Sequence, residues 1–312
     1  GRVRYEYDDA GRTVLRQVVR LSKKPDTWRY EWDAEDRLTM VITPDGTSWR
    51  YAYDPLGRRI GKHGVAADGT VVGSTAFTWQ ESTLIEQTEN RSGRPLTLTW
   101  EYQEGRPLTQ IQNAPQAEID RRFFAVVTDL VGAPTHLIGD NGEVAWRART
   151  TLWGQTTGTG TTTMPLRFPG QYADEETGWH YNYHRHYDPH TARYTTPDPL
   201  GLDPGPHPYA YVHNPHTWSD PLGLAAHRPR AQHLQPDENA TGSHTVFERD
   251  ASGRVTRYQT WIEEPRAPSG WRQGPRFRGE GKPHAGIEPP LYYPTGGGRA
   301  EPATGENLPL GY

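Results

Sequence analysis

Tyr30-Glu31-Trp32-Asp33 is the second of three similar stretches near the start of the chain. Tyr5-Glu6-Tyr7-Asp8 precedes it and Tyr51-Ala52-Tyr53-Asp54 follows it, at spacings of 25 and 21 residues. Each stretch leads into a turn and a basic residue. Alternate aromatic side chains fall on one face of a β-strand, and an Asp-led turn reverses the chain. Because a period of this length is typical of repeat arrays, the pattern predicts successive β-hairpins in one long, curved sheet.

The composition indicates a mainly β protein that fills its core with large rings. The 312 residues include 33 Gly, 28 Pro, 11 Trp and 17 Tyr, and only 33% are hydrophobic. The lack of cysteine excludes disulfides and cysteine-ligated zinc. No apolar run is long enough to span a bilayer, and no signal peptide opens the chain. Since the sequence starts in mid-repeat without Met, we expect it to be the C-terminal part of a longer protein.

The middle of the chain carries closely spaced short motifs. They are TDLVGAP at 128–134, PLRFPGQY at 165–172, ETG at 176–178, YNY at 181–183, YDP at 187–189, TARY at 191–194, PDPLGL at 197–202 and DPLGL at 220–224. Together with the tyrosine repeats, these motifs resemble Rhs proteins. That YD-repeat family includes the C subunits of insecticidal toxin complexes. The resemblance covers residues 1–224.

The resemblance implies that residues 1–120 are Rhs repeats of a β-shell and that residues 121–224 are the Rhs-associated core. In that family the repeats spiral into a hollow cocoon around a C-terminal toxin, and the core plugs one end. We therefore expect a mainly β fold, in which a YD-repeat hairpin spiral is closed by a core plug. A small α+β or β-rich toxin domain follows at 225–312, with 225–240 as a linker.

Asp-Pro-Leu-Gly occurs three times, at Asp54, Asp198 and Asp220, and fits a type I turn. We expect the copy at Asp54 to be only a turn. The resemblance to Rhs cores assigns the other two aspartates to an autoprotease that cuts once, between Leu224 and Ala225. Two adjacent carboxyl groups repel each other when both are ionised, so one stays protonated. The ionised group can then activate water while the protonated group serves as the acid. Holding the peptide beside them makes the reaction intramolecular.

The neighbouring stretch at 184–188 offers further charges. Arg185 and Asp188 are candidates for supporting the aspartate pair electrostatically, with strand-surface charge as the alternative. Four histidines lie in or near this stretch: His180, His184, His186 and His190. His184 and His186 would share one strand face, but no matched third ligand accompanies them. We expect these histidines to pack in an aromatic plug, and we expect no metal or cofactor.

Residues 225–312 lack the tyrosine repeat. Alternation predicts a hairpin with arms at 243–249 and 254–261, followed by an irregular, basic segment after Pro265. Residues 249–282 hold eight basic and four acidic residues, which suits a phosphate-bearing partner. GRVTRY at 253–258 and GKPH at 281–284 resemble polymorphic toxin type 24. Those domains usually continue to a Pro-Pro-His element, whereas Leu291 follows the two prolines in this chain.

We expect the tail to be a metal-independent nuclease. RNA is the first expected substrate and DNA the second. His244 and His284 are the candidate general base and acid, because imidazole titrates near neutral pH. The candidates that hold the phosphate are Arg257, Arg276 and Lys282. The candidates that stack a base are Tyr258, Trp261 and Trp271. The competing interpretation of each residue is ordinary packing or surface exposure.

Two other functional classes stay open. An ADP-ribosyltransferase would recruit Arg254 or Arg257, together with Tyr258 and Glu288, although the tail has no Ser-Thr-Ser strand and no Glu-x-Glu pair. A non-catalytic adhesive or binding tail is the third class. A zinc deaminase of the usual form is excluded because the chain has no cysteine.

The expected partners follow from the Rhs resemblance. They are the chain's own N-terminal Rhs shell, a cognate immunity protein that protects the producer, the delivery machinery and a nucleic acid substrate. We expect a secreted effector of interbacterial competition, whose toxin acts in the cytoplasm of the target cell.

Overall fold

Two compact units make up the chain, Gly1–Pro229 and Arg230–Tyr312. The computed structural model describes residues 2–91, 93–114, 121–203, 205–224, 234, 236, 240–250, 254–265, 267, 270–279, 287–294, 300–304 and 308. All the regular elements among these residues are β-strands, which confirms the mainly β fold. Across the same ranges, no helix has the length and apolar character needed to cross a membrane.

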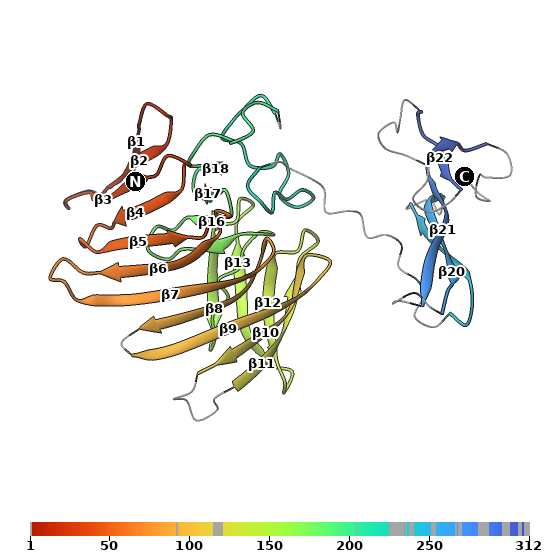
Figure 1. Ribbon diagram of the computed structural model, residues 1–312, viewed down its shortest axis with the longest axis horizontal. Coiled ribbons are helices and arrows are strands. Elements are labelled where there is room, and N and C mark those ends of the chain that lie inside the picture. Colours follow the sequence, from red (N-terminus) through yellow and green to blue (C-terminus); the bar gives the residue numbers. More distant parts are fainter. Residues whose placement is uncertain are drawn as a thin grey trace. The chain divides into compact units, whose positions relative to one another are not determined.

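One 14-stranded antiparallel sheet dominates the first unit, and each strand pairs with the next strand along the chain (Figure 1). Its strands are β1 (Arg2–Tyr7), β2 (Thr13–Val19), β3 (Asp26–Trp32), β4 (Leu38–Ile42), β5 (Ser48–Tyr53), β6 (Arg59–Val65), β7 (Val71–Gln80), β8 (Thr83–Arg91), β9 (Arg94–Gln103), β10 (Arg106–Asn113), β11 (Arg121–Thr128), β12 (Pro134–Gly139), β13 (Val144–Thr150) and β14 (Thr156–Gly160). The tyrosine stretches end β1, β3 and β5. The sheet runs past residue 120, where the core was expected to begin, because β10 pairs with β11.

The three repeat turns use their aspartates in the same way. One carboxylate oxygen accepts the backbone N–H four residues later at 2.9 Å. The other accepts Nε–H of the arginine at that position at 2.7 Å. The pairs are Asp8–Arg12, Asp33–Arg37 and Asp54–Arg58. The basic residue after each stretch therefore completes the turn.

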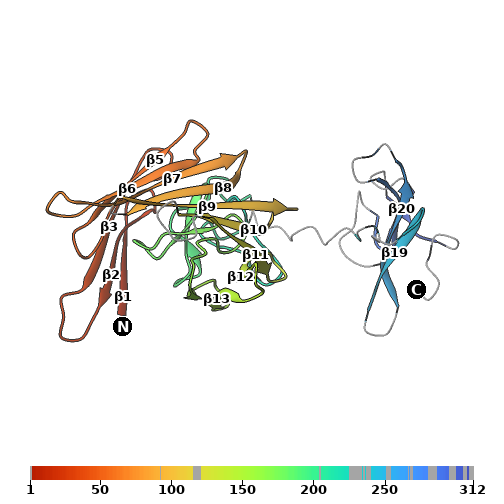
Figure 2. The ribbon, with the colours of Figure 1, turned by 90° about the horizontal axis from the view of Figure 1, so that it is seen from below.

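A smaller sheet, called the inner sheet below, packs against one face of the large sheet, which bends around it (Figures 1 and 2). Its strands are β15 (Tyr172–Ala173), β16 (His180–Asn182), β17 (Arg185–Asp188) and β18 (Arg193–Tyr194). Tyr30 stacks on Trp179 with ring centroids 4.1 Å apart, and Phe77 meets Tyr172 edge-on at 5.0 Å. The alternating aromatics of the repeats thus supply the interface between the two sheets.

A buried ionic cluster fastens β6 to the segment that precedes β16. Arg59 donates to Asp174 at 2.6 and 2.9 Å, and these side chains are 1% and 0% exposed. Lys62 contacts both Asp174 and Glu176, and the Tyr51 hydroxyl donates to Glu176 at 2.9 Å. Burial by itself raises the pKa of Asp174, but Arg59 and Lys62 outweigh burial and hold this pKa below its usual range.

His180 and His186 are buried among rings, as expected, whereas His184 and His190 are exposed, so the expectation that all four pack in an aromatic plug is wrong for these two. His180 hydrogen-bonds Gln171 at 2.8 Å, and His186 lies 5.4 Å from the Tyr181 ring. His184 precedes β17, so it does not share a strand face with His186. Burial, followed by the charge of Arg59, lowers the pKa of His186 to about 3. Within the described ranges, no three His, Asp or Glu side chains gather as metal ligands would.

We expect acid to destabilise the first unit through His186. Below the ordinary histidine pKa of 6.5, the unfolded chain binds a proton that the folded chain refuses until about pH 3. The free energy of unfolding therefore falls as the pH falls, by about 2 kcal/mol between roughly pH 6 and 4.5. Urea unfolding at several pH values measures this slope. His186→Phe should flatten it and the exposed control His190→Gln should not, whereas equal slopes in both variants would contradict the assignment.

The second unit holds a five-stranded antiparallel sheet in chain order. Its strands are β19 (His244–Arg249), β20 (Val255–Glu263), β21 (Trp271–Arg278), β22 (Leu291–Tyr293) and β23 (Glu301–Pro302). The predicted hairpin is confirmed by β19 and β20. The prediction of an irregular segment after Pro265 is wrong, because β21 pairs with β20 and a bulge absorbs Gly274 and Pro275. Of the two expected tail folds, the described residues show the β-rich one.

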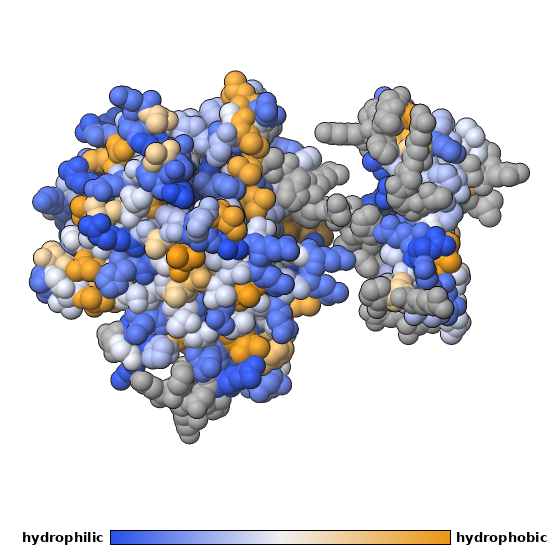
Figure 3. Space-filling model, viewed as in Figure 1, coloured by the Kyte–Doolittle hydropathy of each residue, from blue (hydrophilic) through white to orange (hydrophobic). Residues whose placement is uncertain are grey.

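Polar side chains cover most of the face of the first unit seen in Figure 3, with hydrophobic residues scattered among them. The most exposed apolar side chains include Leu21 at 97% and Leu130 at 82%, both in turns. Single exposed leucines are normal on a protein surface. They do not indicate a docking site.

Candidate functional site

Asp220 opens a turn that ends at Leu224. Its Oδ1 accepts the backbone N–H of Leu224 at 2.9 Å, as Asp54 Oδ1 does from Arg58. The two turns differ at the second carboxylate oxygen. Asp54 Oδ2 binds Arg58 of its own turn, whereas Asp220 Oδ2 contacts side chains of the inner sheet. The carboxylate of Asp54 therefore bonds within its own turn, whereas the carboxylate of Asp220 also bonds to the inner sheet.

Arg185, the first residue of β17, brings Asp198 and Asp220 together. Its Nη2 lies 2.7 Å from Asp198 Oδ2 and 3.4 Å from Asp220 Oδ2. The side chains of Arg185, Asp198 and Asp220 are 1%, 6% and 4% exposed. Arg185 Nε–H also donates to the carbonyl of Gly223 at 2.5 Å. One buried guanidinium thus holds both candidate carboxylates and the backbone immediately before Leu224.

Leu224 lies beside these charged groups. A cavity of about 610 Å³ is lined by Arg185, Asp198, Asp220 and Leu224, together with residues of the 201–213 segment. The cavity therefore gives water access to the carboxylates and to the residue that precedes the expected scissile bond. Ala225, on the other side of that bond, lies outside the described residues.

Close backbone contact fixes the turn at Asp220 in place. Gly223 has a φ of 70°, and a Cβ added there would lie 2.5 Å from the carbonyl oxygen of Asn182. Gly57, at the equivalent position of the Asp54 turn, has a φ of 79° and nothing within 4 Å of an added Cβ. Both turns need a left-handed glycine, but only the second requires the glycine for close approach as well.

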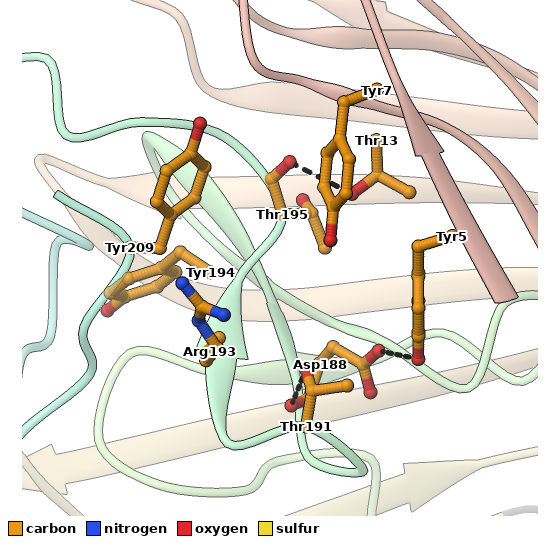
Figure 4. A pocket seen from close by; sticks show the side chains of 9 residues that line it. All are labelled: Tyr5, Tyr7, Thr13, Asp188, Thr191, Arg193, Tyr194, Thr195 and Tyr209. Atoms are coloured by element: carbon orange, nitrogen blue, oxygen red, sulfur yellow. Dashed lines mark hydrogen bonds between the residues drawn. The ribbon is translucent and has the colours of Figure 1, made fainter. Parts of the chain in front are cut away.

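Asp188 does not join the aspartate pair, so of the two candidates for electrostatic support only Arg185 contacts the pair. Successive residues of a strand face opposite sides, so Asp188 and Arg185 point away from each other. The carboxylate of Asp188 accepts the Tyr5 hydroxyl at 2.9 Å and the backbone N–H of His190 at 2.9 Å. Figure 4 shows Asp188 in a separate cavity of about 410 Å³, where its partner Tyr5 comes from β1.

The sequence analysis missed two residues that hold Asp220. The Tyr194 hydroxyl lies 2.8 Å from Asp220 Oδ2, and its ring centroid lies 3.6 Å from Cζ of Arg185. Asn182 Nδ2 lies 2.8 Å from the Tyr194 hydroxyl and 2.8 Å from the carbonyl oxygen of Asp220. Tyrosines are so frequent in this chain that the pattern could not separate Tyr194 from packing residues.

Three candidates in the tail share one face of the second unit's sheet. Strand pairing sets His244 opposite residue 261 of β20, and Arg276 opposite residue 259. Because alternate residues of β20 face the same side, Arg257 lies on this face too. The remaining tail candidates, Lys282 and His284, lie outside the described residues.

The two described arginines already have contacts. Arg257 pairs with Glu248 at 3.0 Å, and its side chain is 31% exposed. Arg276 Cζ lies 4.1 Å above the ring of Tyr293. A phosphate would therefore have to compete with Glu248 for Arg257, while Arg276 meets a neutral ring.

The candidate stacking rings differ in how accessible they are. Trp261 is 7% exposed and donates its Nε1–H to a backbone carbonyl, so it is a core residue. Trp271 meets His244 edge-on at 4.8 Å. Tyr258 stacks on Phe277 at 5.6 Å with an interplanar angle of 16°. Only Tyr258 belongs to a row of rings that reaches an exposed residue, described below.

A family model described as Teneurin YD-shell matches residues 1–204. The chain belongs to the teneurin YD-shell family. A second model, Bacterial toxin 24, matches residues 224–309 of this YD-shell protein. The resemblance to Rhs repeats and to a type 24 toxin is therefore confirmed. The toxin match begins at the leucine that precedes the expected cut.

Curated relatives of this YD-shell chain include proteins named as toxins and one named as a probable deoxyribonuclease. It is 36% identical over 71% of its length to "Probable deoxyribonuclease RhsB" of Dickeya dadantii. It is 34% identical over 72% to "Double-stranded DNA deaminase toxin A" of Burkholderia cenocepacia, and 33% identical over 71% to "Toxin protein Tse5" of Pseudomonas aeruginosa. The chain spans only 15 to 19% of these relatives.

Solved structures show the same shell fold. The TccC3-containing complex "TcdB2-TccC3-TEV" matches with a TM-score of 0.54 and 18% identity. The match covers 71% of this YD-shell chain and 13% of that one. At this level of identity, the likeness establishes the fold alone.

Proposed function

We propose that the YD-shell unit is a toxin carrier that cuts its own chain once, between Leu224 and Ala225, and so releases residues 225–312. The observation that carries the proposal is the contact of Arg185 with both Asp198 and Asp220, in a cavity that Leu224 also lines. The relatives that are named as toxins and the toxin 24 match support a carrier with a toxic tail.

The reaction adds one water molecule across the peptide bond. One carboxylate of the pair takes a proton from water, and the water oxygen bonds to the carbonyl carbon of Leu224. The C–N bond then breaks, and the other carboxyl group gives its proton to the leaving amine of Ala225. Arg185 offsets the repulsion between the carboxylates and holds the adjacent Gly223 carbonyl. Each chain is its own substrate, so it reacts once.

The intact mass of the denatured chain tests the proposal. We expect two fragments that meet at Leu224 and Ala225. One uncut mass would contradict the proposal and would make a covalently attached binding tail the better interpretation.

We propose that the released tail is a nuclease, with RNA ahead of DNA as substrate. The supporting observation is a row of rings across three strands. Phe247 meets Tyr258 at 6.1 Å, and Tyr258 stacks on Phe277 at 5.6 Å. Phe247 is 48% exposed, and Arg249 lies 5.7 Å from its ring. An exposed ring beside a cation suits a single-stranded base, and the buried Phe277 supports the row from below. The row lies on the opposite sheet face from His244, so it supports binding rather than the chemistry.

Incubating the cut protein with RNA, DNA and NAD tests this activity. We expect RNA cleavage, which His244→Ala lowers at least about a hundredfold because it removes an acid–base group. Phe247→Ala should weaken RNA binding roughly fivefold to a hundredfold, since one stacking ring is lost. Thr245→Ala, on the same strand, is the control. Consumption of NAD without nucleic acid cleavage would favour an ADP-ribosyltransferase instead.

The proposed function implies further protein partners. A producer of such a toxin needs an immunity protein that binds the tail, and the carrier needs an upstream shell and delivery machinery. We place the action of the toxin in the cytoplasm of the target cell, after secretion. Co-purification of the tail with the product of a neighbouring gene would identify the immunity protein.

A further inference from the structure

Two buried polar side chains outside the cleavage cavity converge on Asp220. Asn182 is 0% exposed and Tyr194 is 3% exposed. Neither residue lies among those that line the 610 Å³ cavity. They can therefore influence a reaction in that cavity only through the groups that they contact, and among these Asp220, Arg185 and Tyr211 line the cavity.

The direction of each hydrogen bond in this group follows from chemistry. The backbone carbonyl of Asp220 can only accept, so Asn182 must present its NH₂ group to that oxygen. The same NH₂ group lies 2.8 Å from the Tyr194 oxygen, which must then accept. The only proton of the Tyr194 hydroxyl is left for Asp220 Oδ2, 2.8 Å away. Asn182 thus forces Tyr194 to act as a donor to the carboxylate.

Tyr194 also places the guanidinium. Its ring lies flat beneath Arg185, with 3.6 Å between the ring centroid and Cζ. A cation over an aromatic face is attracted to the ring and confined in position. One side chain therefore orients the carboxylate through its hydroxyl and the arginine through its ring.

We propose that Tyr194 and Asn182 are positioning residues for the self-cleavage proposed above. They hold Asp220 as a hydrogen-bond acceptor, fix the rotation of its carboxylate, and keep Arg185 between the two aspartates. The hydroxyl of Tyr194 is the part of this arrangement that can be removed without disturbing the packing.

Tyr194→Phe tests the proposal, because it keeps the ring under Arg185 and deletes the donor. We expect cleavage to slow about tenfold to a hundredfold, the range for losing one hydrogen bond to a charged group. The full chain is synthesised in a cell-free system, synthesis is stopped, and the uncut fraction is followed by gel and intact mass. Tyr187→Phe is the matched control, since the hydroxyl of the buried Tyr187 bonds the backbone of Trp153 at 2.9 Å and touches neither aspartate.

A second measurement separates positioning from general destabilisation. Diluting the stopped reaction into buffers between roughly pH 5 and 8 gives the pH dependence of the rate. Because the Tyr194 hydroxyl bonds directly to Asp220 Oδ2, its removal should change the pH dependence of the cleavage rate. The titratable or charged groups that face Asp220 are Arg185, Tyr194, His184 and Tyr211, with Asp198 across the guanidinium. The Tyr187→Phe profile should match that of wild type.

The outcomes are distinguishable. If the wild-type chain stays uncut, the self-cleavage proposal itself fails. If the wild type is cut and Tyr194→Phe is cut at the same rate, the positioning role fails alone. Equal slowing in Tyr194→Phe and Tyr187→Phe, with unchanged pH profiles and lower thermal stability in both, would assign Tyr194 to packing only.

Discussion

Asp220→Asn and Asp198→Asn should each leave one uncut chain where the wild type gives two fragments. The amide keeps the size of the side chain and can still accept a hydrogen bond, so the turn at Asp220 should survive. It can neither take a proton from water nor give one to the leaving amine at neutral pH. Arg185 would also lose one of its two carboxylate contacts. Intact mass spectrometry of the three proteins gives a yes-or-no answer.

Asp54→Asn is the matched control for this experiment, because the same tetrapeptide surrounds it. The bond from Asp54 Oδ1 to the backbone of Arg58 is the counterpart of the Asp220–Leu224 bond, but Asp54 contacts no second carboxylate through an arginine. We expect normal cleavage in this variant. Loss of cleavage in all three variants would show that the turns matter only for folding, and cleavage in Asp220→Asn would refute the assignment of the pair.

Arg59→Met should destabilise the first unit by about 3–5 kcal/mol, because Asp174 would stay buried while losing its bidentate partner. Lys62 would remain 3.0 Å from Asp174 but is shared with Glu176. The midpoint of urea unfolding, followed by tryptophan fluorescence, measures the loss. Trp179 belongs to the hydrophobic cluster next to this site and reports on the same interface.

Arg58→Met, at the neighbouring position, controls for the loss of an arginine. Arg58 pairs with Asp54 at 2.7 Å at the surface of a turn, with side chains 22% and 14% exposed. Such pairs contribute about 1 kcal/mol or less. The double variant Arg59→Met with Asp174→Leu should recover part of the stability, since no unpaired charge remains. Equal losses in Arg58→Met and Arg59→Met would contradict the importance of burial.

The sequence was sufficient for the repeat architecture, since periodic tyrosines and Asp-led turns are local signals. It was insufficient for the site. Asp54 and Asp220 lie in the same tetrapeptide, and only the contact of Arg185 with Asp220 separates them. The sequence pattern at 184–188 also could not separate Asp188 from Arg185, although an odd spacing along β17 sends the two to opposite sides.

Long-range partners were also invisible in the sequence. Arg59 and Asp174 are separated by 115 positions, and no pattern in either segment points to the other. In the tail, Gly274 and Pro275 have low strand propensity, but pairing with β20 overrides that local preference. The pairing of β21 therefore had to be observed in the structure.

The strand order of the first unit has a consequence for timing during synthesis. Each strand after β1 pairs with its predecessor, so the large sheet can grow as the chain leaves the ribosome, without waiting for distant segments. The side chains that contact Asp220 all come from residues 182–224, which follow the large sheet in the chain. We therefore expect the proposed cleavage site around Asp198 and Asp220 to form after the large sheet. A chain that misfolds early would then keep its tail attached, so the proposed cleavage would occur only in chains that have completed folding.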